Sequence, residues 1–113
     1  MTNTMIDLKQ LQKDAYQNKL DKGFNVTDVA EEFCRAHEEL SEAFKKYHRD
    51  EEGVAEELAD VAIFLLGMSE ILGYDLEAEI AKKMETNRTR QYEKKTNKKG
   101  KAVFIRVKTD LDP

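Results

Sequence analysis

The chain has 113 residues, a formal net charge of −4, 37% charged residues, one proline and one cysteine. This length predicts a single domain with a modest core, for which self-association would provide additional burial. Every stretch of eighteen residues contains a charge, and the N-terminus lacks a basic-then-apolar signal segment. We therefore expect a cytoplasmic protein without a membrane span. The lone Cys34 excludes an internal disulfide, and its place beside Phe33 predicts a buried thiol without chemistry of its own.

The charge is unevenly distributed along the chain. Residues 1–79 hold 8 basic and 19 acidic side chains, whereas residues 80–113 hold 11 basic and 4 acidic ones. Most of the lysines are expected to be solvated, while some could meet the phosphates of a small ligand or a nucleic acid. The overall acidity argues against a nucleic-acid partner. We therefore expect a small-molecule partner, and neither nucleic acid nor membrane.

The periodicity of the apolar residues predicts four helices. The first covers residues 6–22 and ends at a glycine, and the second runs from a capping segment at residues 25–28 to about residue 48. The third, residues 54–72, is apolar almost all round and is expected to form the buried centre. A fourth begins near residue 76 and can extend to Tyr92. These patterns predict an all-α fold in which the second and third helices are antiparallel.

A short acidic motif occurs twice, as Glu39 with Glu42 and as Glu57 with Asp60. Residues three apart on a helix lie about 60° apart, so each pair occupies one face. If the two helices pack antiparallel, four carboxylates converge, and their repulsion calls for a hard divalent cation. Oxygen ligands favour Mg²⁺, with Mn²⁺ also possible.

Asp60 is the most unusual of these acids, because it lies in the most apolar of the predicted helices. Burial of an unpartnered carboxylate costs several kcal/mol, so a buried Asp60 is best explained by a metal or a cationic partner. The neighbouring acids are expected to be solvated instead. These are Glu31, Glu32, Glu38 and Glu56.

The C-terminal end differs from the rest in composition. Residues 94–101 are expected to form a flexible basic linker. Residues 102–107 are β-branched and predict a short strand that pairs with another subunit, or an extended or disordered tail. The sequence thus divides into a helical domain, residues 1–95, and a basic tail, residues 96–113.

The acidic pairs, together with Glu57-Leu58-Ala59-Asp60-Val61 and the later Lys83-Met84-Glu85-Thr86-Asn87-Arg88 segment, resemble the MazG-like all-α nucleoside triphosphate pyrophosphohydrolases. The similarity covers roughly residues 20–92 and is greatest to the small dCTP pyrophosphatase branch. It implies a four-helix MazG-like bundle. It also implies Mg²⁺-dependent hydrolysis of a (deoxy)nucleoside triphosphate to a monophosphate and pyrophosphate, in nucleotide-pool control.

The resemblance also implies roles for individual residues. The implied metal ligands are Glu39, Glu42, Glu57 and Asp60. Glu42 is the first choice for the base that takes a proton from water, with Glu38 or Glu39 as the next candidates. Lys83 is implied to be a catalytic point charge on phosphate, Asn87 to bind sugar or base, and Arg90 to be a second phosphate ligand.

Several alternatives stay open at this point. The chain could be a non-catalytic helical bundle that binds metal or a partner, or a phosphoribosyl-nucleotide pyrophosphohydrolase. The aromatic residues Phe24, Phe44 and Tyr47 could stack on a base, although such residues at helical spacing are more often core. The almost entirely apolar third helix predicts a homodimer or homotetramer, because one small bundle cannot cover it.

Overall fold

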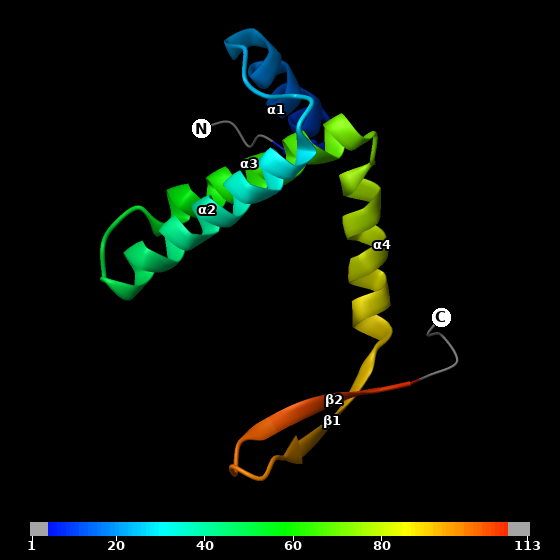
Figure 1. Ribbon diagram of the computed structural model, residues 1–113. Coiled ribbons are helices and arrows are strands. Elements are labelled where there is room, and N and C mark those ends of the chain that lie inside the picture. Colours follow the sequence, from blue (N-terminus) through cyan, green and yellow to red (C-terminus); the bar gives the residue numbers. More distant parts are fainter. Residues whose placement is uncertain (1–4, 109–113) are drawn as a thin grey trace. The chain divides into compact units, whose positions relative to one another are not determined.

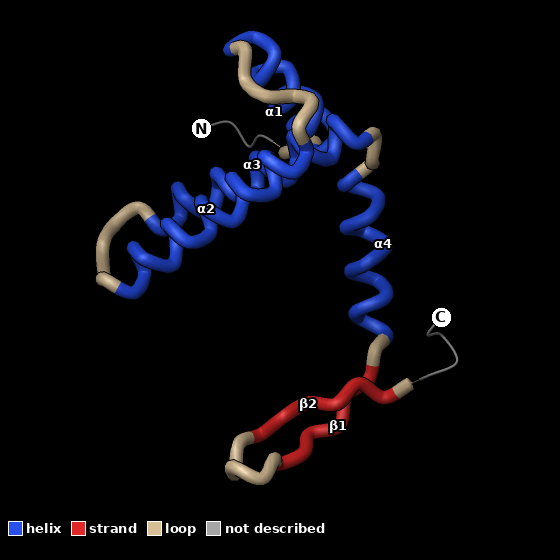
Figure 2. Tube along the Cα trace, in the orientation of Figure 1, coloured by secondary structure: helices blue, strands red, loops and turns tan. Residues whose placement is uncertain are grey.

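The computed structural model describes residues 5–108 and contains four helices followed by a two-stranded sheet (Figures 1 and 2). The elements are α1 (Leu8–Lys22), α2 (Val29–His48), α3 (Val54–Leu72), α4 (Leu76–Thr89), β1 (Gln91–Thr96) and β2 (Ala102–Val107). The predicted helical fold is confirmed, with the small sheet added. The chain forms two compact units, residues 1–77 and 78–113. Within the described residues, no helix combines the length and apolarity needed to cross a membrane.

In the first unit, α3 packs against both α1 and α2. The helices α2 and α3 are antiparallel neighbours joined by a short loop, as predicted (Figure 1). Gly53 ends this loop with φ of +98°, a conformation that side chains disfavour, and a Cβ there would lie 3.1 Å from the Lys46 amine. The loop therefore depends on glycine at this position. Because the loop joins α2 to α3, the alignment of these two helices depends on Gly53 as well.

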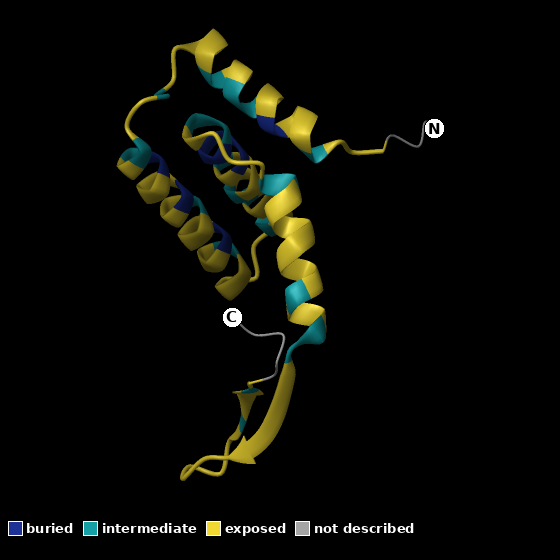
Figure 3. Ribbon diagram, turned by 90° about the vertical axis from the view of Figure 1, so that its right-hand side faces the viewer, coloured by how far each residue is buried: buried dark blue, intermediate teal, exposed yellow. Residues whose placement is uncertain are grey.

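The core of the chain is small. The buried apolar side chains among the described residues are Ala36, Ala43, Leu66 and Met68, and most of the ribbon in Figure 3 has the colour of exposed residues. The prediction that α3 forms the buried centre is wrong for most of the helix: only residues 66–69 are buried, whereas Leu58 is 50% and Leu65 45% exposed and Asp60 is also exposed. The reason is that α1 and α2 cover only part of this helix within one chain. Cys34 is likewise exposed rather than buried.

Gln12 on α1 links three segments of the first unit. Its side chain is 5% exposed. Its Nε2 donates to the Glu70 carboxylate at 2.9 Å and to the Tyr74 carbonyl at 2.7 Å, and its Oε1 accepts from the Leu76 backbone amide at 3.3 Å. One buried amide thus fixes α1 against the end of α3 and satisfies a free amide at the start of α4.

The second unit ends in an antiparallel hairpin instead of an unpaired tail. The strands pair from Gln91 opposite Val107 to Thr96 opposite Ala102. The expectation that the fourth helix extends to Tyr92 is wrong, because α4 ends at Thr89.

The basic segment 94–101 is the end of β1 and the turn, and residues 102–107 pair within the chain. The turn is closed by Asn97, whose Oδ1 accepts from the amides of Lys99 at 3.0 Å and Lys101 at 2.9 Å. Residues 109–113 of the predicted tail lie outside the described residues.

Replacing Gln12 with methionine is expected to destabilise the protein by about 1–3 kcal/mol, because Glu70, the Tyr74 carbonyl and the Leu76 amide would lose their partner in a partly buried position. Chemical unfolding followed by circular dichroism measures this loss. The control Gln10→Met removes an exposed bond to Asp14 on the same helix. Equal stability of the two variants would contradict the linking role of Gln12.

Candidate metal centre

The adjacent faces of α2 and α3 bring three of the predicted acidic residues together. Glu39 of α2 and Glu57 and Asp60 of α3 each place a carboxylate oxygen within 4.8 Å of the others. Glu39 and Glu57 are half-buried, whereas Asp60 is exposed. The i,i+3 spacing of Glu57 and Asp60 places both on the side of α3 that meets Glu39, as the sequence predicts.

The crowding of these acids changes their protonation. The pKa of Glu39 is raised because its carboxyl shares a hydrogen bond with Glu57, and burial and the charges of Glu57, Asp60 and Glu42 act in the same direction. The pKa of Glu57 is lowered, mainly because Lys46 donates to its Oε1 at 2.9 Å and secondly because of the bond with Glu39. The same contact raises the pKa of Lys46. Of these two acids, Glu39 is therefore the one whose charged form the cluster disfavours.

The donor set of this cluster fits a hard divalent cation. All three donors are carboxylate oxygens, which Mg²⁺ and Mn²⁺ prefer, and they are close enough to share one ion. The pKa of Glu39 is raised mainly by its hydrogen bond with Glu57 and by burial; the charges of Glu57, Asp60 and Glu42, which a bound cation would offset, add to the shift.

Lys46 is the cation that the sequence reasoning missed. It lies seven residues after Glu39, so two helical turns place both on one face of α2, and that spacing is the signal that could have found it.

Glu42 lies outside this group of three. It is exposed and pairs with Lys45 on its own helix at 3.5 Å, although its charge still contributes to the raised pKa of Glu39. Glu38 and Glu56 are exposed, as expected for solvated acids. The same expectation was wrong for Glu32, which is 1% exposed.

The remaining predicted site residues lie in the second unit. Lys83 and Asn87 are four residues apart on α4 and so share a face, and both are exposed. The Asn87 Oδ1 accepts from Arg90 Nη1 at 2.9 Å. The Arg90 Nε is buried and has no hydrogen-bond partner within residues 5–108. These three residues belong to the second unit and the acidic cluster to the first, and their predicted roles stay predictions.

The comparison with protein families decides the class of the protein. The MazG-like family matches residues 23–103, which is most of the chain. The chain belongs to the MazG-like family. A solved structure of a cyanophage S-2L MazG-like pyrophosphohydrolase, bound to dGDP and three catalytic Mn²⁺ ions per active site, is similar in fold, with a TM-score of 0.63 and 21% sequence identity. The match covers 89% of this chain and 99% of that one. No curated protein matches the chain.

In this MazG-like protein, Glu39→Gln is expected to raise the melting temperature of the metal-free form by a few degrees at pH 7. A raised pKa means that the folded state binds the proton more tightly, so stability falls as pH rises above 4.5 through the raised pKa. The increase in melting temperature of Glu39→Gln over the wild type should therefore be largest at pH 7 and become smaller as the pH falls towards 4.5. Thermal unfolding in the presence of a chelator measures it.

The matched control for this prediction is Glu38→Gln, which removes an exposed acid next to Glu39. It should leave the melting temperature unchanged across the same pH range. A melting temperature of Glu39→Gln at or below that of the wild type at pH 7 would mean that the cluster is not under electrostatic strain.

Proposed function

We propose that this chain is a divalent-metal-dependent nucleoside triphosphate pyrophosphohydrolase, which cleaves a (deoxy)nucleoside triphosphate to a monophosphate and pyrophosphate. The observation that carries this proposal is the cluster of Glu39, Glu57 and Asp60 in a chain of the MazG-like family. Further support is that the similar phage structure is described as a pyrophosphohydrolase bound to a nucleotide and Mn²⁺.

In this proposal the three clustered carboxylates hold the metal, with Glu42 as a further ligand. Mg²⁺ or Mn²⁺ bound there would neutralise negative charge on phosphate oxygens and help to activate water. Glu42 is also our choice for the base that takes the proton from the attacking water. Because it is exposed and outside the group of three, it can turn from Lys45 towards the substrate without leaving a buried group unpaired.

The basic residues of α4 and its C-terminal end are proposed to contact the substrate. Lys83 is assigned to the phosphates, because it is exposed and has no ion pair within the described part of the chain. Asn87 is assigned to the sugar or base, which requires its Oδ1 to exchange Arg90 for the ligand. Arg90 would then be free to bind a phosphate oxygen.

We also propose that the protein acts as a homodimer or homotetramer. An apolar groove of about 230 Å³ lies between α2 and α3 and is lined by Leu40, Ala43, Phe44, Tyr47, Val54 and Leu58. Phe44 and Tyr47 are 63% and 72% exposed in the single chain, so a second copy would bury much apolar surface there. We further propose that the protein is cytoplasmic and that its reaction controls nucleotide pools.

The experiment that tests this function follows the products of hydrolysis with separate detection of pyrophosphate and orthophosphate. Each common ribo- and deoxynucleoside triphosphate is offered with Mg²⁺ and, in parallel, with Mn²⁺. We expect pyrophosphate and monophosphate as primary products from at least one nucleotide. Asp60→Asn is expected to lower turnover by a hundredfold or more, roughly the effect of removing one group that stabilises transition-state charge.

The matched control is Glu56→Gln, an exposed acid on the same helix turn that lies outside the cluster. It should keep wild-type turnover, and circular dichroism should show that both variants retain the helical fold. Orthophosphate and a nucleoside diphosphate as primary products would refute cleavage between the α and β phosphates. Full activity of Asp60→Asn would refute the metal site.

A further inference from the structure

The ammonium group of Lys46 contacts the acidic cluster at one edge. It lies near the C-terminal end of α2 and donates to Oε1 of Glu57 at 2.9 Å. Within residues 5–108 its ion pair is with Glu57 and not with Glu39 or Asp60. A cation that competed with a metal would be expected among all three acids. The position of Lys46 at the edge therefore indicates a contact that accompanies metal binding.

The loop between α2 and α3 leaves space for Lys46 to reach this position. A Cβ built on Gly53 would lie 3.1 Å from the Lys46 Nζ, 3.6 Å from its Cδ and 3.8 Å from its Cε, so the side chain runs along the bare backbone of Gly53. The Gly53 carbonyl accepts from the Glu57 amide at 3.2 Å, and the Lys46 carbonyl accepts from the Glu51 amide at 2.8 Å. The lysine, the loop and the acid are thus linked at the start of α3.

Partial burial makes the contact between Lys46 and Glu57 more directional than a surface ion pair. Their side chains are 30% and 18% exposed. Water and salt screen a partly buried pair less than an exposed one, and a hydrogen bond between two charged groups is short and strong. The bond therefore restricts rotation of the Glu57 carboxylate, which keeps the orientation in which it faces Glu39 and Asp60.

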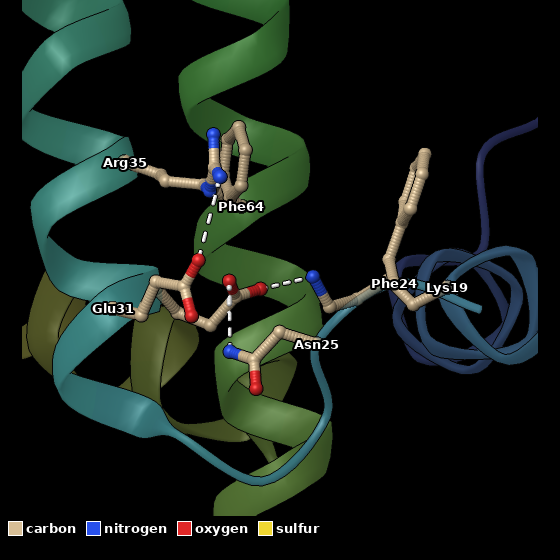
Figure 4. Close-up of a pocket in the computed structure, with 7 residues that line it drawn as sticks. Lys19, Phe24, Asn25, Glu31, Arg35 and Phe64 are labelled. Carbon is tan, nitrogen blue, oxygen red and sulfur yellow. Dashed lines mark hydrogen bonds and ion pairs between the residues drawn. The ribbon is translucent and has the colours of Figure 1, made fainter. Parts of the chain in front are cut away.

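A second lysine–glutamate pair between helices shows a different arrangement. Lys19 of α1 pairs with Glu32 at the start of α2, and their side chains are 12% and 1% exposed (Figure 4). Glu32 is not among the three described acids that could share an ion, so this pair only connects two helices. Glu57 bonds to Lys46 and still has a carboxylate oxygen within 4.8 Å of the other two acids of the cluster. The Lys46 pair therefore leaves its acid available to a cation.

We propose that Lys46 is a positioning residue of the metal centre, which holds the Glu57 carboxylate towards Glu39 and Asp60 so that the three acids bind a divalent cation. A carboxylate has about four lone-pair sites, so Glu57 can accept from Lys46 and bind a metal at the same time. Loss of a hydrogen-bond partner that orients a metal ligand lowers metal affinity by roughly 10- to 100-fold. This inference rests on the proposed function for the presence of a metal at the cluster.

The test measures Mn²⁺ affinity without nucleotide, from the electron paramagnetic resonance signal of free Mn²⁺. Lys46→Met should weaken binding by roughly tenfold or more, because Glu57 is no longer held towards the other ligands. Lys46→Arg keeps a donor and a positive charge and should restore most of the affinity. Binding by Lys46→Met as tight as or tighter than that of the wild type would overturn the inference, as would Lys46→Arg binding no better than Lys46→Met.

The matched control for charge is Arg49→Met. It removes an exposed cation three residues after Lys46. Loss of a positive charge alone lowers the repulsion of a bound cation, so this variant should bind Mn²⁺ at least as tightly as the wild type. Circular dichroism should show that each variant keeps its helices. A loss of affinity in Arg49→Met as large as in Lys46→Met would overturn the inference.

A measurement on the wild type keeps the inference testable if Lys46→Met does not fold. The side-chain ammonium signal of Lys46 in ¹⁵N-labelled protein can be assigned by its loss in Lys46→Arg. We expect this signal to persist when the protein is saturated with Mg²⁺, because the lysine and the metal bind Glu57 together. Loss of the signal at saturation would mean that the metal displaces Lys46, and would overturn the inference.

The same measurements separate this inference from the proposed function. Weaker Mn²⁺ binding in Lys46→Met, restored by Lys46→Arg, would support the positioning role even if no triphosphate released pyrophosphate. Pyrophosphate release together with equal Mn²⁺ affinities in the wild type and Lys46→Met would support the function and overturn the positioning role. A wild type that binds no Mn²⁺ would overturn both the metal site and the role of Lys46.

Discussion

The electrostatic repulsion among three carboxylates on adjacent faces of α2 and α3 is the constraint on which the rest of the account depends. Glu39, Glu57 and Asp60 are held together because the two helices are antiparallel neighbours joined by a loop that requires Gly53. Lys46 offsets part of this repulsion at Glu57. The pKa of Glu39 is raised by its hydrogen bond with Glu57 and by burial, and the neighbouring charges add to the shift. A fold that keeps such a cluster gives up some stability for a function, which here is best explained by cation binding.

Buried polar contacts position the parts of the first unit around that cluster. Gln12 connects α1 to the end of α3, and the Lys19–Glu32 pair connects α1 to α2 at the side of α3. With so few apolar side chains buried in one chain, these directional contacts define the arrangement of the helices more sharply than hydrophobic burial alone could.

The sequence predicted what local periodicity determines and failed where partners are distant. The four helices, the antiparallel α2 and α3, and the convergence of Glu39 with Glu57 and Asp60 follow from apolar and acidic spacing. The burial of Glu32 does not, because its partner Lys19 comes from another helix. The exposure of Asp60 could not be predicted either, because it depends on which side of α3 the helices α1 and α2 leave uncovered. A strand at residues 102–107 was one of the predicted alternatives, and β2 confirms it. Its partner β1 was missed because the charged residues of β1 continue the pattern of α4, and only the facing β2 makes them a strand.

The measurement that tests the central claim most directly is Mn²⁺ titration of ¹⁵N-labelled protein followed by paramagnetic broadening of amide signals. The account predicts that substoichiometric Mn²⁺ first removes the signals around Glu39, Glu57 and Asp60, while amides around the exposed acids Glu51 and Glu52 persist. Excess Mg²⁺ should restore the lost signals. Broadening spread evenly over the exposed acids, or signals around the cluster that persist to saturation, would contradict a metal centre between α2 and α3.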